Sequence, residues 1–273
     1  MTIEPRAEPM PPDLLLRASD LHHTYCIGLP EEHKALGGIS FSVEQGEFVS
    51  IVGPSGCGKS TLMRCLSGLM APTSGTVSME GETVTSVPPD LTLVFQDYSR
   101  SLYPWLRVAD NVEFPLKGIG LPKTERHERV AQALADVGLT GHETKYPRQL
   151  SGGMQQRVAI ARALAYQPAM LLMDEPYASV DAQTRESLED MLLDVWARRK
   201  KTVLFVTHDI DESVYLADRV LVLSKGPSQV IADLAVDIPR PRDQIETKAM
   251  SQFVALRAEV ARLIRDAGRD DDG

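Results

Sequence analysis

A glycine-rich segment that follows a short apolar run at 48–52 constrains the fold of this chain more than any other feature. It reads Gly53-Pro54-Ser55-Gly56-Cys57-Gly58-Lys59-Ser60-Thr61. The order G-x-x-x-x-G-K-[ST] between a strand and a helix is typical of a loop that cradles phosphate groups. Backbone N–H groups and the helix start hold phosphate oxygens, Lys59 reaches the β and γ phosphates, and Ser60 can ligate Mg²⁺. A chance glycine-rich turn is the alternative, but strand, loop, lysine and hydroxyl coincide, so we predict a nucleotide site.

Two acidic residues end a second apolar run, at 170–173, and supply what such a site also needs. Transfer of a γ-phosphoryl group to water depends on positioning the water and neutralising charge on the phosphate oxygens. We therefore predict that Asp174 holds the Mg²⁺ and that Glu175 polarises the attacking water. An acidic pair that simply ends a core strand before Pro176 is the alternative, and the phosphate loop upstream disfavours it.

Composition and charge exclude several other classes of protein. The 273 residues include 29 Lys and Arg against 38 Asp and Glu, a net charge of −9, which argues against a protein that binds nucleic acid through phosphate neutralisation. The three cysteines have no C-x-x-C spacing and form neither a disulfide framework nor a zinc knuckle. No run approaches the ~18 apolar residues of a membrane helix. We expect a chain that is neither exported nor membrane-spanning by itself.

The order of the predicted elements indicates an α/β fold. Apolar runs alternate with helical patterns, which is typical of a largely parallel sheet covered by helices. We predict strands at 39–43, 47–52, 76–79, 91–95, 169–173, 202–206 and 220–223, and helices at 123–137, 152–165 and 182–199. Outside this core we expect a disordered, proline-rich leader at 1–13 and a C-terminal helix at about 245–267 with an acidic tail.

One more segment narrows the class, because a serine and two glycines open the helix predicted at 152–165, in Leu150-Ser151-Gly152-Gly153-Met154-Gln155-Gln156-Arg157. Backbone N–H groups at a helix start suit an anion. With this segment the chain resembles the ATP-binding cassette (ABC) ATPases, because the segment matches the signature sequence of that family. The resemblance implies a P-loop NTPase of ABC type at 14–235, with a mixed sheet core, a helical subdomain inserted at 97–165, and 236–273 as a C-terminal extension. It also implies nucleotide contacts from Ser151, Gly152, Gly153 and Gln155.

The same resemblance assigns roles to four single residues that carry little weight alone. It implies that Tyr25 stacks on adenine and that His208 contacts the γ-phosphate during catalysis. It implies that Gln96 links the metal to a membrane partner and takes part in catalysis, and that Asp181 crosses a head-to-tail dimer. Taken alone, the tyrosine would be a core or surface aromatic, the glutamine a solvated residue at a strand end, and the histidine a structural residue. In the dimer, the signature of one subunit closes over ATP held by the phosphate loop of the other.

Two further stretches bear on the partner of such an ATPase. The stretch 177–186 reads Y-A-S-V-D-A-Q-T-R-E and resembles the F-G-A-L-D-A-Q-T-R-E of the importer ATPases for nitrate, taurine and aliphatic sulfonates, departing from it at 177–180. The aromatic stretch at 97–106 either lines a groove that receives a helix of the permease or fills the small core of the helical insertion. Both interpretations of that stretch are open at this point.

We therefore predict an ATP-hydrolysing subunit that uses ATP and Mg²⁺ and pairs with a second ATPase subunit, either a copy of itself, which we favour, or a paralogue. It would power uptake of a small nitrate-, sulfonate- or taurine-like solute through a separate permease, which a solute-binding protein serves. We expect it at the cytoplasmic face of the membrane, without a nucleic-acid partner. Two other functions stay open: a soluble ABC-type ATPase without a membrane partner, and an interaction protein that senses ATP without hydrolysing it.

Overall fold

The computed structural model describes residues 11, 13–96 and 101–268, which form two compact units. The first unit holds the described parts of 1–89, 202–238 and 249–273, and the second holds those of 90–201 and 239–248. Most of the predicted leader, positions 97–100 of the aromatic stretch and the acidic tail at 270–272 lie outside the described residues. Within the described ranges, no helix is both long enough and apolar enough to cross a bilayer.

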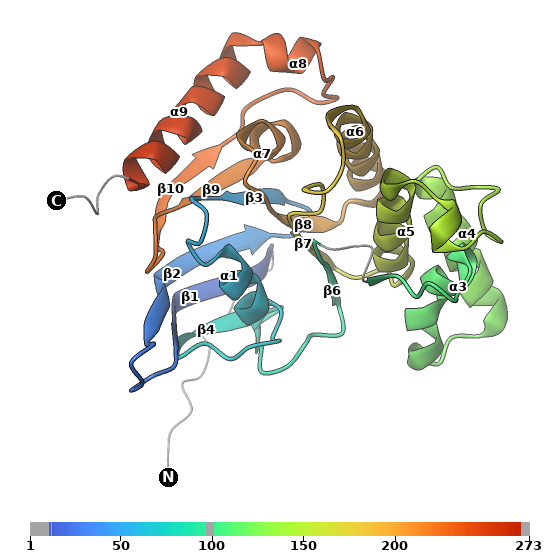
Figure 1. Ribbon diagram of the computed structural model, residues 1–273, viewed down its shortest axis with the longest axis horizontal. Helices are drawn as coiled ribbons and strands as arrows, with labels where there is room; N and C mark the ends of the chain where they lie inside the picture. Colours follow the sequence, from blue (N-terminus) through green and yellow to red (C-terminus); the bar gives the residue numbers. More distant parts are fainter. Residues whose placement is uncertain (1–10, 12, 97–100, 269–273) are drawn as a thin grey trace. The chain divides into compact units, whose positions relative to one another are not determined.

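The first unit contains two sheets (Figure 1). One is antiparallel with the strand order β2-β1-β4-β5, and the other runs β10-β9-β3-β8 within this unit, parallel except for β10. The strands of the antiparallel sheet are β1 (Leu14–Tyr25), β2 (His33–Glu44), β4 (Ser74–Met79) and β5 (Glu82–Thr83). Those of the other sheet are β3 (Phe48–Val52), β8 (Thr202–Val206), β9 (Arg219–Leu223) and β10 (Val230–Ala235).

In the sheet that contains β3, the burial of each strand matches its central or edge position. Every residue of β3 and β8 is buried, as continuous apolar runs are when both faces of a parallel sheet are covered. The alternating exposure of β10 is that of an edge strand. Helices α7 (Ile210–Leu216) and α9 (Ser251–Ala267) pack against this sheet and against each other, while α1 (Lys59–Leu66) follows β3 (Figure 1).

The second unit combines two parallel strands with most of the helices. The strands are β6 (Leu91–Val94) and β7 (Met170–Asp174), paired in register from Leu91 opposite Met170 to Val94 opposite Met173. Helices α3, α4 and α5 pack on one another (Figure 1). The helices of this unit are α3 (Val108–Glu113), the 3-10 helix η1 (Phe114–Ile119), α4 (Lys123–Asp136), η2 (Pro147–Gln149), α5 (Gly152–Ala165), α6 (Ala182–Arg199) and α8 (Glu246–Ala249).

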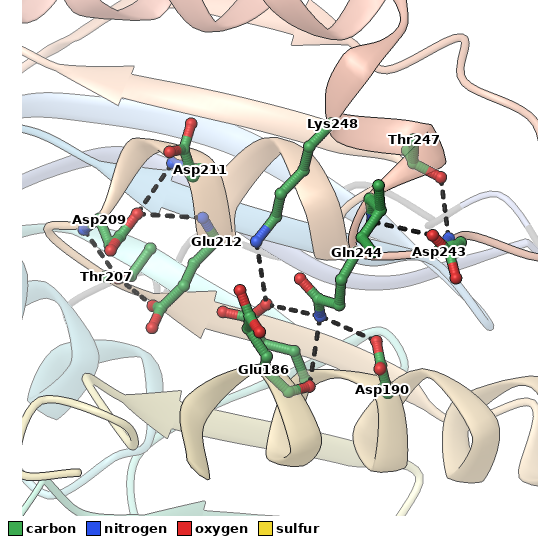
Figure 2. A network of polar contacts seen from close by, with 12 residues as sticks. Glu186, Asp190, Thr207, Asp209, Asp211, Glu212, Asp243, Gln244, Thr247 and Lys248 are labelled. Carbon is green, nitrogen blue, oxygen red and sulfur yellow. Dashed lines mark hydrogen bonds and ion pairs between the residues drawn. The ribbon is translucent and has the colours of Figure 1, made fainter. Parts of the chain in front are cut away.

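Polar contacts hold the segment 239–248 against α6 inside the second unit (Figure 2). The side-chain amide of Gln244 donates hydrogen bonds to Asp190 at 2.8 Å and to Glu189 at 3.0 Å. Glu189 is 2% exposed, and the ammonium of Lys248 lies 3.8 Å from its carboxylate. A charge this well buried needs such partners, so these contacts anchor the segment.

The structure confirms the strands and helices whose sequence pattern is strong and adds others. Helices α5 and α6 and strand β8 begin and end where they were predicted. Strands β1 and β10 were not predicted, because polar residues interrupt the apolar pattern in β1 and Asp233 interrupts it in β10. The single helix predicted at 245–267 is wrong: extended backbone at Met250 separates α8 from α9. The domain boundaries at 14, 97, 165 and 235 stay predictions.

Candidate nucleotide site

The predicted phosphate loop connects β3 to α1 in the first unit. Gly56 and Gly58 have φ angles of 75° and 98°, in the left-handed region that residues with side chains rarely adopt. A Cβ atom on Gly58 would also lie 2.9 Å from the carbonyl oxygen of Ala35. These positions require glycine, and they turn the chain so that α1 begins at Lys59.

The ammonium group of Lys59 lies inside this loop. Its Nζ donates hydrogen bonds to the carbonyl oxygens of Gly53 at 2.9 Å and Pro54 at 3.1 Å, and the residue is 7% exposed. An ammonium has three donors and is compact, so it suits phosphate oxygens held by the same loop. The next residue, Ser60, is exposed, whereas Thr61 is buried in the first turn of α1.

Tyr25 lies beside the start of α1, although 36 positions separate it from Thr61 in sequence. Its hydroxyl is 3.0 Å from the Oγ1 atom of Thr61 and 3.7 Å from the sulfur of Met70. The edge of the His23 ring meets the Tyr25 ring at 4.5 Å between centroids, with the ring planes at 76°. These contacts fix the ring next to the phosphate loop, where an aromatic platform for a base would have to be.

His208 lies just beyond β8, on the edge of the sheet from which the phosphate loop also leaves. Strands β3 and β8 are parallel, with Ile51 opposite Val206, so the residues after both strands emerge at the same edge. The N–H of Thr207 donates a hydrogen bond to the carbonyl of Ile51 at 3.1 Å. The side chain of His208 is exposed at this edge.

In the second unit, parallel pairing of β6 with β7 brings Gln96 to Glu175. The side-chain amide of Gln96 donates a hydrogen bond to a carboxylate oxygen of Glu175 at 3.4 Å. Asp174 is the last residue of β7, and Glu175 has a φ of 43°, a left-handed conformation that makes the chain turn sharply after the strand. Gln96, Asp174 and Glu175, three of the predicted catalytic and metal-binding residues, thus lie together at the carboxyl ends of β6 and β7.

The residue types gathered there fit a magnesium ion that is bound together with a nucleotide. Mg²⁺ prefers oxygen ligands and is usually held by one or two protein carboxylates plus phosphate oxygens. Asp174 and Gln96 supply such oxygens in the second unit, and Ser60 supplies a hydroxyl in the first. Among residues 11, 13–96 and 101–268, no three His, Cys, Asp or Glu side chains gather into a cage for a metal, an arrangement that a nucleotide-bound Mg²⁺ does not need.

The signature segment and Asp181 meet through one threonine. Ser151 is the N-cap of α5, and its Oγ atom accepts a hydrogen bond from the N–H of Met154 at 3.3 Å. A Cβ atom on Gly153 would overlap the Cγ2 atom of Thr184, so a larger residue here would force Thr184 or its helix to shift. Thr184 in turn donates two hydrogen bonds to Asp181, from its N–H at 3.0 Å and its hydroxyl at 2.7 Å.

Those two hydrogen bonds hold the pKa of Asp181 below its usual value, because both favour the charged form of the carboxylate. Asp181 is also the N-cap of α6, where a negative charge is favourable. The side-chain amide of Gln155, another predicted nucleotide contact, donates a hydrogen bond to the carbonyl of Leu150 at 3.2 Å, within the signature segment.

The predicted site residues therefore form one group in each unit. The first unit holds Tyr25, positions 53–61 and His208, and the second holds Gln96, Asp174, Glu175, Asp181 and the signature positions 151–155. No role was predicted for Thr184 or for the hydrogen-bond partners of the His208 turn. The spacing Asp209-x-x-Glu212 is typical of a helix start and could have drawn attention to that turn.

An apolar hollow borders the Gln96 end of β6. A cavity of about 230 Å³ is lined by β6, Arg162, Tyr166 and neighbouring residues, and a second hollow that shares Phe95 continues to Tyr103 and Phe114. Trp105 is 70% exposed, and its ring lies tilted against that of Tyr103, with 5.5 Å between the ring centroids. Trp105 does not fill a core, which favours the interpretation of this stretch as a docking surface.

The model of the ABC transporter family matches residues 36–178 of this chain. The chain belongs to the ABC transporter family. As a member of this family it is an ATP-binding ATPase of the kind that serves import systems.

Two relatives extend the match over most of the chain. An uncharacterized ABC transporter ATP-binding protein, MJ0412 of Methanocaldococcus jannaschii, is 47% identical over 233 residues, which is 85% of each chain. The nitrate import ATP-binding protein NrtD of a Synechocystis species is 42% identical over 262 residues, covering 94% of this chain and 97% of that protein.

Two solved structures of ABC cassettes have the same fold. The dimeric, post-hydrolysis structure of the cassette MJ0796 bound to ADP and Pi is 34% identical, with a TM-score of 0.70 over 81% of this chain and 99% of that one. The structure of cbiO1 from Clostridium perfringens, part of the ABC transporter complex cbiONQ, is 29% identical, with a TM-score of 0.76 over 94% of this chain and 98% of that one. The predicted fold class is confirmed.

The departures from the importer pattern at 177–180 include one that the packing explains. Tyr177, which stands where the pattern has phenylalanine, is 1% exposed. Its added hydroxyl donates a hydrogen bond to the carbonyl of Leu188 at 3.4 Å. A buried hydroxyl with a partner avoids the cost of an unpaired polar group, so the substitution is compatible with this core.

Proposed function

We propose that this ABC ATPase powers uptake of a small oxyanionic solute, such as nitrate or a sulfonate, or of a taurine-like solute, through a separate permease. One observation carries the link between hydrolysis and transport: Gln96 contacts Glu175, and the preceding residue, Phe95, lines the apolar hollow. A partner seated in that hollow would act on the residue beside the hydrolytic carboxylate. The solute class follows the similarity to the nitrate import protein NrtD.

The chemistry follows from the roles of the individual residues. Lys59 and the loop amides bind the β and γ phosphates, Tyr25 stacks on the base, and Glu175 accepts a proton from the attacking water. A bound Mg²⁺ would neutralise charge on the phosphate oxygens and would be held by Ser60, Asp174 and Gln96. His208 contacts the γ-phosphate at the edge it shares with the loop.

Hydrolysis in this proposal requires a second copy of the chain. Ser151 and Gly153 open α5, a 14-residue helix whose N–H groups and dipole suit a γ-phosphate. In a head-to-tail pair the signature of one subunit covers the ATP bound by the other, and Asp181 contacts the opposite site. Closure then assembles the site, which links turnover to movement.

The exposed aromatic patch formed by Phe95, Trp105 and Phe114 is the proposed contact for a helix of the permease. These residues are 50%, 70% and 46% exposed, and a patch of this kind suits an amphipathic helix. Docking there would hold the ATPase at the cytoplasmic face of the membrane. A solute-binding protein would deliver the solute to the permease from the other side.

A phosphate-release assay with a matched binding measurement tests the proposal. Glu175→Gln keeps the size of the side chain and removes the base, so we expect ATP binding within about threefold of wild type and turnover lower by about 10²-fold or more. Hydrolysis by Glu175→Gln at the wild-type rate would refute the role of Glu175. Tight ATP binding by the wild type with no phosphate release, even with the permease present, would favour a sensor of ATP instead.

A further inference from the structure

A buried pair of side chains lies directly behind the turn that carries His208. Thr207 and Glu212 are 1% and 4% exposed. The hydroxyl of Thr207 donates a hydrogen bond to a carboxylate oxygen of Glu212 at 2.5 Å. The same hydroxyl oxygen accepts a hydrogen bond from the N–H of Asp209 at 3.0 Å (Figure 2). The hydroxyl therefore uses its donor and an acceptor position to bind two residues that follow His208, which closes the turn around this residue.

Further hydrogen bonds tie both ends of the turn to regular structure. The N–H of Thr207 donates to Ile51 in β3, the strand that leads into the phosphate loop. One carboxylate oxygen of Asp209 accepts the N–H groups of Asp211 at 2.9 Å and Glu212 at 3.2 Å, which caps α7 (Figure 2). The turn is thus fixed to β3 before His208 and to α7 after it, while the imidazole itself stays exposed.

The contact between Thr207 and Glu212 joins these two attachments through a charged group. A hydrogen bond to a charged carboxylate is shorter and about twice as strong as a neutral one. Removing the hydroxyl would leave a buried carboxylate and the N–H of Asp209 each without this partner, and the turn would relax. Displacement of a catalytic group by about 1 Å can lower a rate by about 10²-fold.

We propose that Glu212, acting through the hydroxyl of Thr207, is a positioning residue that sets the location of His208 relative to the phosphate loop. The proposal rests on the proposed contact of His208 with the γ-phosphate. Glu212 is 4% exposed behind the turn and so offers almost no surface to a nucleotide. It acts only through the backbone on which His208 stands.

The test uses the full-length chain, MgATP and single-turnover hydrolysis of radiolabelled ATP, which resolves slow rates. Thr207→Val replaces the hydroxyl by a methyl group of similar size, and Thr207→Ser keeps the hydroxyl as the matched control. We expect Thr207→Val and Glu212→Ala to lower the rate about tenfold to a hundredfold, with ATP affinity within about threefold of wild type. Thr207→Ser and Glu212→Gln, which preserve the donor and the acceptor, should stay within about threefold of the wild-type rate.

A double variant separates positioning from general stability. In a His208→Ala background the turn has no imidazole to position, so Thr207→Val should lower the residual rate by less than about twofold. If Thr207→Val lowers the rate by the same factor with and without His208, the effect is structural and the proposal is overturned. If Glu212→Ala does not fold, the Thr207→Val and Thr207→Ser pair gives the answer.

The same measurements distinguish failure of this inference from failure of the proposed function. If His208→Ala is slow but Thr207→Val hydrolyses ATP as fast as wild type, the inference is overturned and the role of His208 stands. If His208→Ala itself retains the wild-type rate, the proposed γ-phosphate contact is refuted, and the positioning role is overturned with it.

Discussion

Gly153→Ala is the substitution for which the structure makes the sharpest prediction. The new Cβ atom would lie under 3.0 Å from the Cγ2 atom of Thr184, a separation that real Cβ atoms essentially never show. Gly153 is buried between α5 and α6, and Thr184 is held by its two hydrogen bonds to Asp181. The clash therefore cannot be relieved by a simple rotation of a free side chain, and the helices must shift.

Two opposing contributions set the change in the free energy of unfolding that Gly153→Ala should cause. Overpacking of a core costs about 1–3 kcal/mol. Replacing glycine by alanine within a helix recovers at most ~1 kcal/mol, because alanine loses less backbone entropy on folding. Taking the middle of the overpacking range, about 2 kcal/mol, and subtracting up to ~1 kcal/mol leaves a net loss of about 1–2 kcal/mol. At about 2–4 °C per kcal/mol for a chain of this size, the melting temperature should fall by about 2–8 °C.

Thermal unfolding followed by circular dichroism measures this loss, and two further variants serve as controls. Thr184→Ser removes Cγ2 but keeps the hydroxyl that binds Asp181, so Gly153→Ala with Thr184→Ser should regain the stability to within about 0.5 kcal/mol. Gly118→Ala adds a Cβ where nothing lies within 4 Å and should not lower the melting temperature. A Gly153→Ala protein as stable as wild type, or one that Thr184→Ser does not rescue, would refute the reasoning.

Three other predictions concern single side chains. Tyr25→Ala should weaken ATP binding about two- to tenfold, the contribution of one aromatic stack, and Tyr25→Phe should weaken it less. Competition with a fluorescent nucleotide measures both affinities, and an unchanged affinity of Tyr25→Ala would contradict adenine stacking. Trp105→Ala should change the stability by no more than about 0.5 kcal/mol, because the ring is 70% exposed, yet lower copurification with the permease; retained copurification would argue against the docking surface. Burial raises the pKa of Cys65 to about 11, so its thiol stays protonated and unreactive at pH 8, whereas the exposed Cys26 should be alkylated; mass spectrometry that finds Cys65 labelled in the folded protein would contradict this.

The parts of the fold that the sequence predicted are those where local pattern and tertiary environment agree. Strand β8 is a run of buried apolar residues between a helix and a turn, and α5 has a serine cap at its start, so both were located to the residue. Strand β1 escaped prediction because its stability comes from pairing with β2 and β4, which no local window reveals. The break at Met250 escaped because no glycine or proline stands between positions 245 and 267 to mark the end of a helix.

The residues proposed to contact the nucleotide were easier to predict than the residues that position them. Lys59, Glu175 and Ser151 stand in motifs whose spacing the phosphate chemistry itself requires. Thr184 lies within the stretch 177–186 and Thr207 beside His208, but neither was assigned a role, because each acts through contacts with neighbours three and five positions away. Only the folded chain shows that one excludes a side chain at Gly153 and that the other joins β3 to α7.

The central claim is that two copies of this chain share each ATP, and the mass of the Glu175→Gln protein in solution tests it most directly. A single chain has a mass of 30.0 kDa. Light scattering should report this mass without nucleotide and twice this mass with MgATP, because ATP that is bound but not hydrolysed holds the signature of one subunit against the phosphate loop of the other. A Glu175→Gln protein that keeps the single-chain mass when saturated with MgATP, while the wild type hydrolyses ATP under the same conditions, would contradict the account.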